Sequence, residues 1–281
     1  MEWIDLTAGP IAFEDTGGDG PTVVLVHGLL MDGRQWRKVV PELGDGYRFV
    51  MPTLPMGAHT RPMRAGADLS LKGMVAILAE FLERLDLREV TLCFNDWCGA
   101  PVMIAEGLAD RVARLALVSC ESFDNYPPGL AGHAAWLAAK LPGGVRVMRW
   151  SLLRPRLRRL PFVFGQMAKH GVPDELMRSW LEPLRNPEIR RDFARYAGDA
   201  MRGRRDLIAA TTALGSFKEP VLVVWDEEGK MMPNSHGDRL AGAFPDGRLV
   251  TLPDCYTLIP QDQPRALAAH LREFIDGPVP T

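Results

Sequence analysis

The stretch VTLCFNDWCGA, residues 90–100, decides how this chain is interpreted. It opens with apolar and β-branched residues, which predict a strand buried on both faces, and the apolar spacing from Gly99 to Leu108 predicts a helix. Asp96 therefore stands on the turn where a buried strand passes directly into a helix. A carboxylate at such a turn is either the N-cap of the helix or a reactive group at the carboxyl end of a strand, where α/β proteins bind ligands.

Strands and helices of the same kind alternate on both sides of this turn. Strands that are apolar on both faces and alternate with helices predict a mostly parallel sheet flanked by helices, which is the α/β class. The expected strands lie at residues 22–26, 47–51, 90–94, 115–118, 221–225 and 248–252, and the expected helices at residues 36–43, 71–85, 99–108, 235–243 and 264–275.

The alternation stops between residues 125 and 212. This segment is rich in Arg, Trp, Pro and Met, has helical apolar spacing and contains no convincing strand. The simplest architecture keeps one sheet and inserts the helical segment into it. We therefore expect a sheet domain of residues 1–124 and 213–281, interrupted by a helical cap of residues 125–212.

The composition narrows the classes of partner. A net charge of −2 over 281 residues gives no general attraction to nucleic acid or to an anionic membrane. We expect a small-molecule substrate, no nucleic-acid or membrane partner, and a chain compatible with a homodimer. No basic segment followed by an apolar run opens the chain, so no signal peptide is expected. The cysteines lack metal-ligand spacing, which predicts reduced thiols in a cytoplasmic protein without metal or cofactor: Cys93, Cys98, Cys120 and Cys255.

Several segments carry a family resemblance. His27-Gly28 follows one expected strand, LPMGAH (residues 54–59) follows the next, and Trp225 closes a later one. With the turn at Asp96, the chain resembles the α/β-hydrolase superfamily over nearly its whole length, and the Asp looks like the branch of epoxide hydrolases and haloalkane dehalogenases. The resemblance implies that Asp96 is a nucleophile that forms an ester with substrate carbon. This context is more specific than an Asp before a helix and favours the nucleophile over the N-cap.

The resemblance also assigns supporting groups. The backbone N-H groups of Leu29 and Trp97 match the oxyanion hole of the family. Glu121 follows the expected strand of residues 115–118, and some members of the family place the acid of the catalytic triad after the corresponding strand. A carboxylate suits the nucleophile because it is ordinarily ionised at neutral pH without help from a base.

The chain departs from the family pattern at several positions. Phe94 and Cys98 flank the turn where Gly is usual. Thr257 stands where the family has the His that activates water, and Gly229 stands where the acid that orients this His is expected. The atypical triad therefore lacks its His, because no histidine of the chain lies on the loop of residues 254–264: His27, His59, His133, His170, His236 and His270.

The missing His argues against simple dehalogenation, because the ester would lack the base that clears it. Leu29 and Leu30 also replace the polar side chain that a halide site needs. Opening an epoxide on a small aromatic or polycyclic substrate depends less on the base that this chain lacks. We therefore predict an atypical epoxide-hydrolase-like hydrolase with a role in bacterial secondary metabolism.

The remaining candidate site residues are aromatic. Tyr256 is favoured over Tyr126 and Tyr196 as the donor of a proton to the departing oxygen. Aromatic side chains of the cap suit an apolar substrate pocket, although each of them also suits the cap's own core. The expected substrate-binding residues are Trp97, Tyr126, Trp136, Trp150 and Tyr196.

Other functions stay open. A non-hydrolytic lyase, isomerase or cyclase on the same fold would use Asp96 as a general base. A catalytically inactive ligand-binding homologue would also explain the missing triad members. A serine esterase is least favoured, because no Ser occupies the turn.

Overall fold

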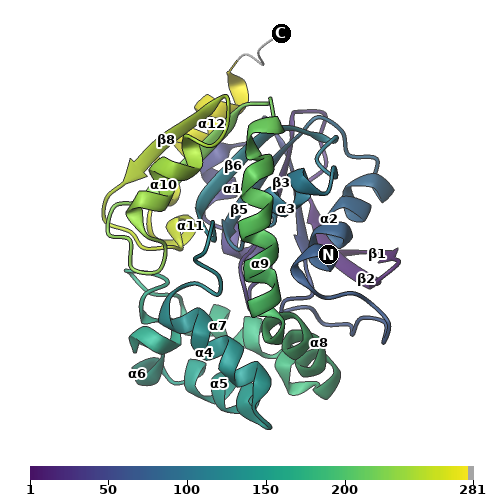
Figure 1. The fold of residues 1–281 in the computed structure, drawn as a ribbon, viewed down its shortest axis with the longest axis vertical. Coiled ribbons are helices and arrows are strands. Elements are labelled where there is room, and N and C mark those ends of the chain that lie inside the picture. The colour runs from purple at the N-terminus through teal and green to yellow at the C-terminus, as the bar shows by residue number, and fades with distance from the viewer. Residues whose placement is uncertain (278–281) are drawn as a thin grey trace.

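The computed structural model describes residues 1–277 and contains one eight-stranded sheet with helices on both faces (Figure 1). The strand order is β1-β2-β4-β3-β5-β6-β7-β8. The pairs β1/β2 and β2/β4 are antiparallel and all other pairs are parallel, so the predicted α/β architecture is confirmed. The strands are β1 (Glu2–Leu6), β2 (Gly9–Asp15), β3 (Thr22–Val26), β4 (Arg48–Thr53), β5 (Val90–Asp96), β6 (Val112–Cys120), β7 (Val221–Asp226) and β8 (Gly247–Leu252).

The N-terminal hairpin of β1 and β2 was not anticipated from the sequence. β1 is an edge strand, and most of its residues keep some solvent contact. Its residues Glu2 to Leu6 therefore form no continuous apolar run, and the pattern that reveals the buried parallel strands is absent there.

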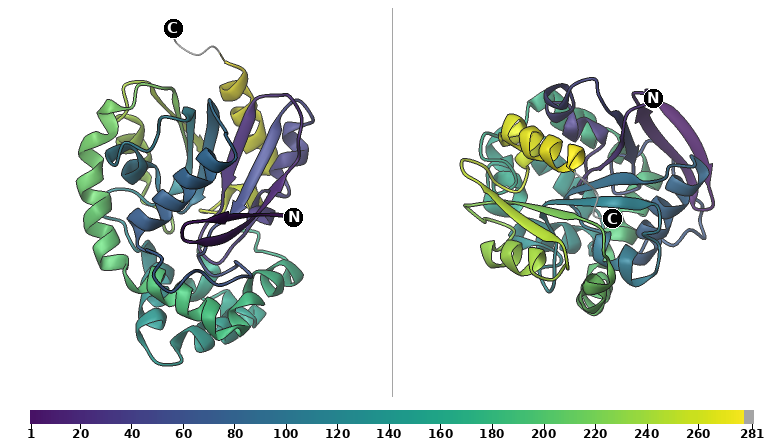
Figure 2. Two further views of the ribbon diagram at one scale, coloured as in Figure 1. Left: turned by 90° about the vertical axis from the view of Figure 1, so that its right-hand side faces the viewer. Right: turned by 90° about the horizontal axis from the view of Figure 1, so that it is seen from above.

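Two helical layers cover the parallel strands, as two further views show (Figure 2). Alternate residues of β3 face opposite layers. Val24 and Val26 belong to the core that includes α2, α3 and α9, whereas Val23 and Leu25 pack in the core that includes α1 and α12. The elements in and around these layers are η1 (Gly33–Trp36), α1 (Val39–Leu43), α2 (Leu71–Arg84), α3 (Ala100–Ala105), α9 (Ala200–Ala210), η4 (Thr211–Ser216), α10 (Asn234–Ala241), α11 (Ile259–Asp262) and α12 (Pro264–Asp276).

A further group of helices, inserted between β6 and β7, lies at the lower end of the molecule in Figure 1. The last α-helix before β7, α9, runs along the sheet domain and packs against α2 and α3. Within residues 1–277 no helix has the length and apolar composition needed to cross a membrane. The lower group comprises α4 (Gly129–Lys140), α5 (Gly144–Leu152), α6 (Pro155–Arg158), η2 (Pro161–Gly165), α7 (Asp174–Leu181), η3 (Pro183–Arg185) and α8 (Pro187–Gly198).

Candidate active site

Asp96 ends β5 in a strained backbone conformation. Its φ is 67°, in the left-handed region that a residue with a Cβ rarely adopts. The turn therefore keeps its strained conformation although Phe94 and Cys98 occupy the positions where Gly is usual. Both of these side chains are buried. The N-cap of α3 is Gly99, not Asp96, and the helix receives no side-chain cap. The alternative in which Asp96 serves as a helix cap is thus wrong.

The carboxylate of Asp96 is held against the end of β3. Its Oδ2 accepts a hydrogen bond from the backbone N-H of Leu29 at 3.0 Å. A Cβ on Gly28 would overlap Oδ2, so glycine is required next to the carboxylate. The His27-Gly28 segment therefore provides both the donor and the space that Asp96 needs.

A polar network fixes the turn from behind. The side-chain amide of Asn95 donates to the carbonyl oxygens of Val118 and Thr257, at 2.8 Å each. Gln35 donates to Oδ1 of Asn95 at 2.5 Å and accepts from the N-H of Gly28 at 2.8 Å. The ends of β3, β5 and β6 and the loop of Thr257 are thereby joined at Asn95, the residue before Asp96.

Trp97 does not have the geometry that the resemblance implies. Its backbone N-H donates to the carbonyl of Asn95 at 2.9 Å instead of pointing freely into a site. Its ring packs edge-on against Phe94, with centroids 5.6 Å apart, and would overlap a Cβ on Gly99. Of the expected oxyanion-hole pair, only Leu29 points its N-H at Asp96.

Glu121 lies directly beside Asp96. Its backbone N-H donates to the Asp96 carbonyl at 3.0 Å, and its Oε2 accepts from the N-H of Cys98 at 3.4 Å. Asp96 is 4% exposed and Glu121 6% exposed. Two acidic residues are therefore buried next to each other at the ends of β5 and β6.

Burial gives these two acids unusual proton affinities. Desolvation raises the pKa of Asp96 to about 7, although the Leu29 N-H acts in the opposite direction. Desolvation, and then the charge of Asp96, raises the pKa of Glu121 well above its usual range. Near neutral pH the pair thus holds a protonated Glu121 next to an Asp96 that readily gains and loses its proton.

Two tyrosines stand near the carboxyl pair. The hydroxyl of Tyr126 donates to the hydroxyl of Tyr196 at 3.0 Å, and each residue is 4% exposed. Burial raises the pKa of both phenols well above the ordinary value, so both stay protonated. The Tyr196 hydroxyl keeps its own proton for a ligand.

A cavity of about 650 Å³ brings these groups together. It is lined mainly by apolar side chains of the inserted helices, and its polar side chains are few. The indole Nε1 of Trp136 also belongs to the lining and has no hydrogen-bond partner among the described residues. The polar groups of the lining are those of Asp96, Glu121, Tyr126, Tyr196, Ser151 and Trp136.

Three predicted site residues do not line the cavity: the expected proton donor Tyr256 and the expected substrate-binding residues Trp97 and Trp150. Tyr256 is outside the cavity, with its ring 5.8 Å from Nζ of Lys230. Trp150 is 50% exposed and stacks with Arg154, and Trp97 is buried behind the turn. The sequence could not separate these aromatics from Tyr126, Trp136 and Tyr196, because local sequence patterns do not reveal which side chains meet a cavity.

Among residues 1–277, no histidine belongs to the cavity lining. Nε2 of His27 accepts from the backbone N-H of Leu54 at 2.9 Å, and His59 pairs with Asp192 at 3.5 Å. Thr257 is fully buried, its carbonyl accepts from Asn95, and its Oγ1 lacks a hydrogen-bond partner in the described part of the chain. The loop of Thr257 therefore lies beside the turn, with no imidazole.

The acids at the end of β7 and just after it form local contacts. The Asp226 carboxylate accepts from Oγ of Ser119 at 2.6 Å and from the N-H of Gly229 at 2.8 Å. Glu228 forms an ion pair with Lys169. Neither acid lines the cavity, so Glu121 is the acid that accompanies Asp96. Among the described residues, no group of three or more His, Cys, Asp or Glu is placed to hold a metal ion.

Gln35 and the contact between the two tyrosines were not predicted from the sequence. Gln35 is the link between Gly28 and Asn95, and nothing in its local pattern marks it. Tyr126 and Tyr196 lie 70 positions apart, so their hydrogen bond leaves no signal in the spacing of nearby residues.

Comparison with known proteins gives sequence relatives of low identity. The chain is 22% identical over 258 residues to an uncharacterized hydrolase of Bacillus subtilis, covering 90% of this chain and 89% of that one. It is 26% identical to a haloalkane dehalogenase of Mycobacterium bovis, covering 96% and 93%. A 2-hydroxy-6-oxononadienedioate/2-hydroxy-6-oxononatrienedioate hydrolase of Cupriavidus pinatubonensis is also 26% identical, covering 84% and 80%.

Solved structures share the fold. An esterase from Thermogutta terrifontis has a TM-score of 0.75 at 22% identity, covering 98% of both chains. A putative ancestral haloalkane dehalogenase has a TM-score of 0.76 at 21% identity, also with 98% of both chains covered. The sequence model of the family described as alpha/beta hydrolase fold matches residues 21–262. With this match and the strand order above, the chain belongs to the alpha/beta hydrolase fold family.

Proposed function

We propose that this α/β-fold hydrolase opens an epoxide on a small aromatic or polycyclic substrate, with Asp96 as the nucleophile. The supporting observation is the pair of buried carboxyl groups, Asp96 and Glu121, in one apolar cavity whose lining contains no histidine. One carboxyl is free to lose its proton near neutral pH and the other retains it. An acid and a base are therefore available side by side.

In the ring-opening step, ionised Asp96 attacks a ring carbon and the C-O bond of the epoxide breaks. The departing oxygen takes the proton of Glu121, with the hydroxyl of Tyr196 donating a hydrogen bond to it. The products are an ester between Asp96 and the substrate, a new hydroxyl group, and an ionised Glu121. Proton donation of this kind contributes roughly a hundredfold or more to such a step.

Ester cleavage then reuses Glu121, which takes over the task of the missing His. The ionised Glu121 accepts a proton from water, and the water oxygen attacks the carbonyl carbon of the Asp96 ester. The N-H of Leu29 stabilises the developing oxyanion. Release of the diol returns Asp96 to the carboxylate and Glu121 to the acid, so protons balance over the cycle.

The cavity favours an apolar substrate of moderate size. A volume of about 650 Å³ with an apolar lining suits an aromatic or polycyclic ligand. A halide substrate, suggested by the relatives named haloalkane dehalogenase, is less well supported, since Leu29 and Leu30 line the cavity after His27-Gly28 and offer no side-chain donor.

A single-turnover experiment in ¹⁸O-labelled water tests the proposal. Excess protein is mixed with aromatic epoxides such as styrene oxide or trans-stilbene oxide. An Asp96 ester predicts a substrate-mass adduct on the native protein, unlabelled diol in the first turnover, and ¹⁸O in the peptide that contains Asp96. Asp96→Asn should form no adduct.

The other outcomes are equally specific. Labelled diol in the first turnover, without protein labelling, would mean that Asp96 activates water directly. Asp96→Asn with undiminished turnover would exclude any catalytic role for this carboxylate. If neither an adduct nor a product appeared with any epoxide of the panel, the result would favour a ligand-binding homologue.

A second candidate is a non-hydrolytic lyase, isomerase or cyclase that uses Asp96 as a general base. The observation in its favour is the pKa of about 7, since a base works best when its pKa lies near the working pH. Its product would contain no oxygen from labelled water at any turnover, and Asp96 would also remain unlabelled. The same experiment thus separates the two candidates.

A further inference from the structure

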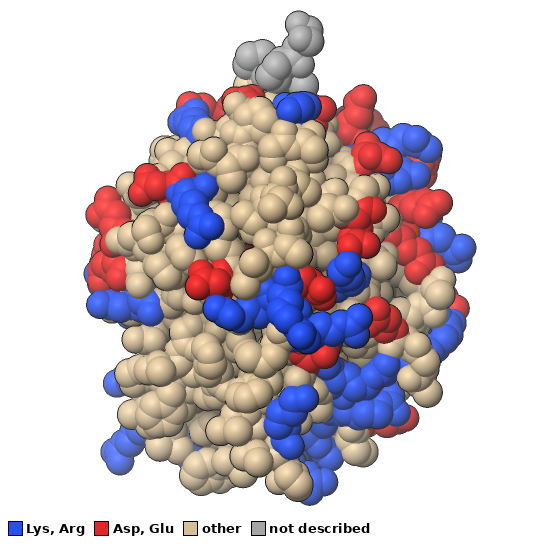
Figure 3. Space-filling model, viewed as in Figure 1, with Lys and Arg blue, Asp and Glu red and all other residues tan. Residues whose placement is uncertain are grey.

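The charge of the chain is unevenly distributed. Residues 125–173 contain eight Lys or Arg and neither Asp nor Glu, so the segment carries +8 in a chain whose total is −2. The segment forms α4, α5, α6 and η2, which pack against one another. Figure 3 shows this lower end of the molecule as a largely uncharged surface with scattered basic groups. Charge of one sign on one face attracts a partner of the opposite sign.

Several of these cations have no acidic partner. Arg146, Arg156 and Arg159 are exposed, and no ion pair to any of them is present among the described residues. Arg154 stacks on the ring of Trp150, with Cζ 3.6 Å from the ring centroid. Their charges are therefore available to an external anionic surface.

The same face exposes large apolar side chains. Of the ten exposed large hydrophobic residues in the described chain, seven belong to residues 125–173. Val147 is 65% exposed, Leu141 53%, Phe162 52%, and Leu137 and Trp150 50% each. Exposed apolar groups concentrated in this way mark an interaction surface.

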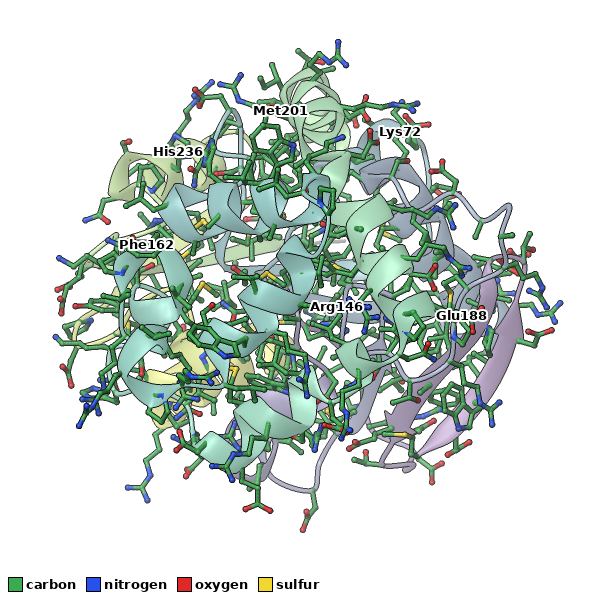
Figure 4. All side chains as sticks on the ribbon, turned by 90° about the horizontal axis from the view of Figure 1, so that it is seen from below. Lys72, Arg146, Phe162, Glu188, Met201 and His236 are labelled. Atoms are coloured by element: carbon green, nitrogen blue, oxygen red, sulfur yellow. The ribbon has the colours of Figure 1, made fainter. Side chains whose placement is uncertain are left out.

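Some of these apolar residues lie at the mouth of the cavity, where its lining meets solvent. Leu137, Leu141, Val147 and Phe162 are exposed and also line the cavity that contains Asp96. Figure 4 looks onto this end of the molecule and shows Arg146 and Phe162 at separate places on it. We call the exposed surface of α4, α5, α6 and η2 the cap face.

We propose that the cap face docks on an anionic membrane surface and that the cavity takes its apolar substrate from the bilayer. Cationic side chains beside exposed Trp, Phe and Leu have the chemistry of an interfacial membrane contact. A bilayer supplies anionic headgroups for the unpaired arginines. It also supplies an apolar phase for the exposed apolar side chains at the mouth of the cavity. Whole-chain charge suggested no membrane partner, because acidic residues elsewhere mask the basic segment.

Self-association through the cap face is disfavoured by the same charges. Two copies meeting there would bring the unpaired arginines of both chains together, and like charges oppose such a contact. An acidic protein would satisfy the arginines, but it would not by itself deliver an apolar substrate to the mouth. The membrane docking is independent of the reaction at Asp96.

Vesicle sedimentation with the full chain tests the docking. Native protein should sediment with phosphatidylcholine vesicles that contain phosphatidylglycerol, but not with phosphatidylcholine alone, and salt should weaken the binding. The triple variant Arg146→Glu, Arg156→Glu, Arg159→Glu should lose roughly a hundredfold or more in affinity. A control with the same charge change, Arg88→Glu, Lys218→Glu, Arg248→Glu, alters residues near the amino ends of the strands and should bind nearly as the native protein does.

Insertion of the apolar side chains is measured separately. Trp150 is the exposed tryptophan of the described chain, so brominated lipids should quench its fluorescence, and Trp150→Phe should abolish that change. Val147→Ser should weaken binding several-fold without a change in charge. Circular dichroism and thermal melting confirm that each variant is folded.

Three results would overturn the docking proposal. The first is failure of the native protein to bind anionic vesicles at low salt. The second is equal loss of binding in the control and in the triple variant. The third is binding of an acidic polypeptide such as polyglutamate, dependent on the same arginines, without vesicle binding, which would indicate an acidic protein partner. All readouts are independent of turnover, so failure of the epoxide proposal would be recognised separately.

Discussion

The backbone N-H of Glu121 donates to the carbonyl oxygen of Asp96 at 3.0 Å, which fixes two acidic residues next to each other at the ends of β5 and β6. Because both side chains are buried in an apolar cavity, the second carboxyl can ionise only at a large electrostatic cost. The pair therefore divides naturally into a protonated and an ionisable member. This relationship supports the proposed acid and base roles and leads to the following expectations.

Asp96→Asn should stabilise the protein at alkaline pH. The folded-state pKa of Asp96 is raised from 3.8 to about 7, so the folded state binds this proton more tightly than the unfolded chain does. Stability from this group is present below the unfolded pKa and is lost as pH rises towards about 7. At about pH 8 the variant should gain roughly 2 kcal/mol or more in the free energy of unfolding, with a smaller gain at about pH 5. Urea titrations of the native protein and of Asp96→Asn at the two pH values measure this gain. Equal free energies of unfolding for the two proteins at both pH values would contradict the prediction.

Glu121→Gln should slow both chemical steps. The amide can neither protonate the departing oxygen nor accept a proton from water, so turnover should fall roughly a hundredfold or more. Any ester that still forms should persist and be visible by intact-mass analysis. Glu228→Gln is the matched control, because Glu228 pairs with Lys169 outside the cavity and its loss should leave turnover within about twofold. Undiminished turnover in Glu121→Gln would remove the proposed base.

Tyr196→Phe should lower the rate of ring opening more than Tyr126→Phe does. Tyr196 accepts a hydrogen bond from Tyr126 and has its own hydrogen available for the substrate, so its loss removes the direct donor. A decrease of about tenfold or more is expected, since one hydrogen bond to developing charge contributes roughly 2 kcal/mol. Tyr256→Phe, outside the cavity, is the control and should behave as the native protein. A larger loss in Tyr256→Phe would show that the hydrogen-bond donor to the departing oxygen was assigned to the wrong tyrosine.

Gly28→Ala should disable the site. The added methyl group would overlap Oδ2 of Asp96, so the carboxylate must leave its hydrogen bond with Leu29. Turnover should fall roughly a hundredfold, the scale of misplacing a reacting group by about 1 Å. Gly66→Ala is the control, because its Cβ meets nothing within 4 Å. Comparable turnover in both variants would mean that the position of Asp96 is unimportant.

Thr257→Val should be neutral or slightly stabilising. The Thr257 hydroxyl is buried and finds no hydrogen-bond partner among the described residues, so an isosteric methyl group removes an uncompensated polar group. The gain should be about 1 kcal/mol, with turnover unchanged. Thermal melting and steady-state kinetics measure the two effects. A marked loss of activity would instead assign the hydroxyl a place in catalysis.

Local patterns were sufficient to predict the strands β3 to β8 and the position of Asp96. The runs at residues 22–26 and 90–94 are apolar on both faces because the sheet is covered on both sides, and that covering is recorded in each strand's own residues. β1 escaped prediction because it is an edge strand and has no continuous apolar run. The observed turn also agrees with the expected strand-to-helix passage, although α3 ends earlier than residue 108.

By itself, the sequence determined the fold class, the carboxylate at the end of β5 and the lack of a histidine on the loop of Thr257. Only the tertiary structure decided which groups surround that carboxylate. Leu29, Glu121 and Tyr196 come from distant segments, and their distances to Asp96 depend on how the strands and inserted helices pack. The tertiary structure also decided the proton affinities of Asp96 and Glu121. Desolvation and charge-charge interaction act through space, so the order of residues along the chain does not encode them locally.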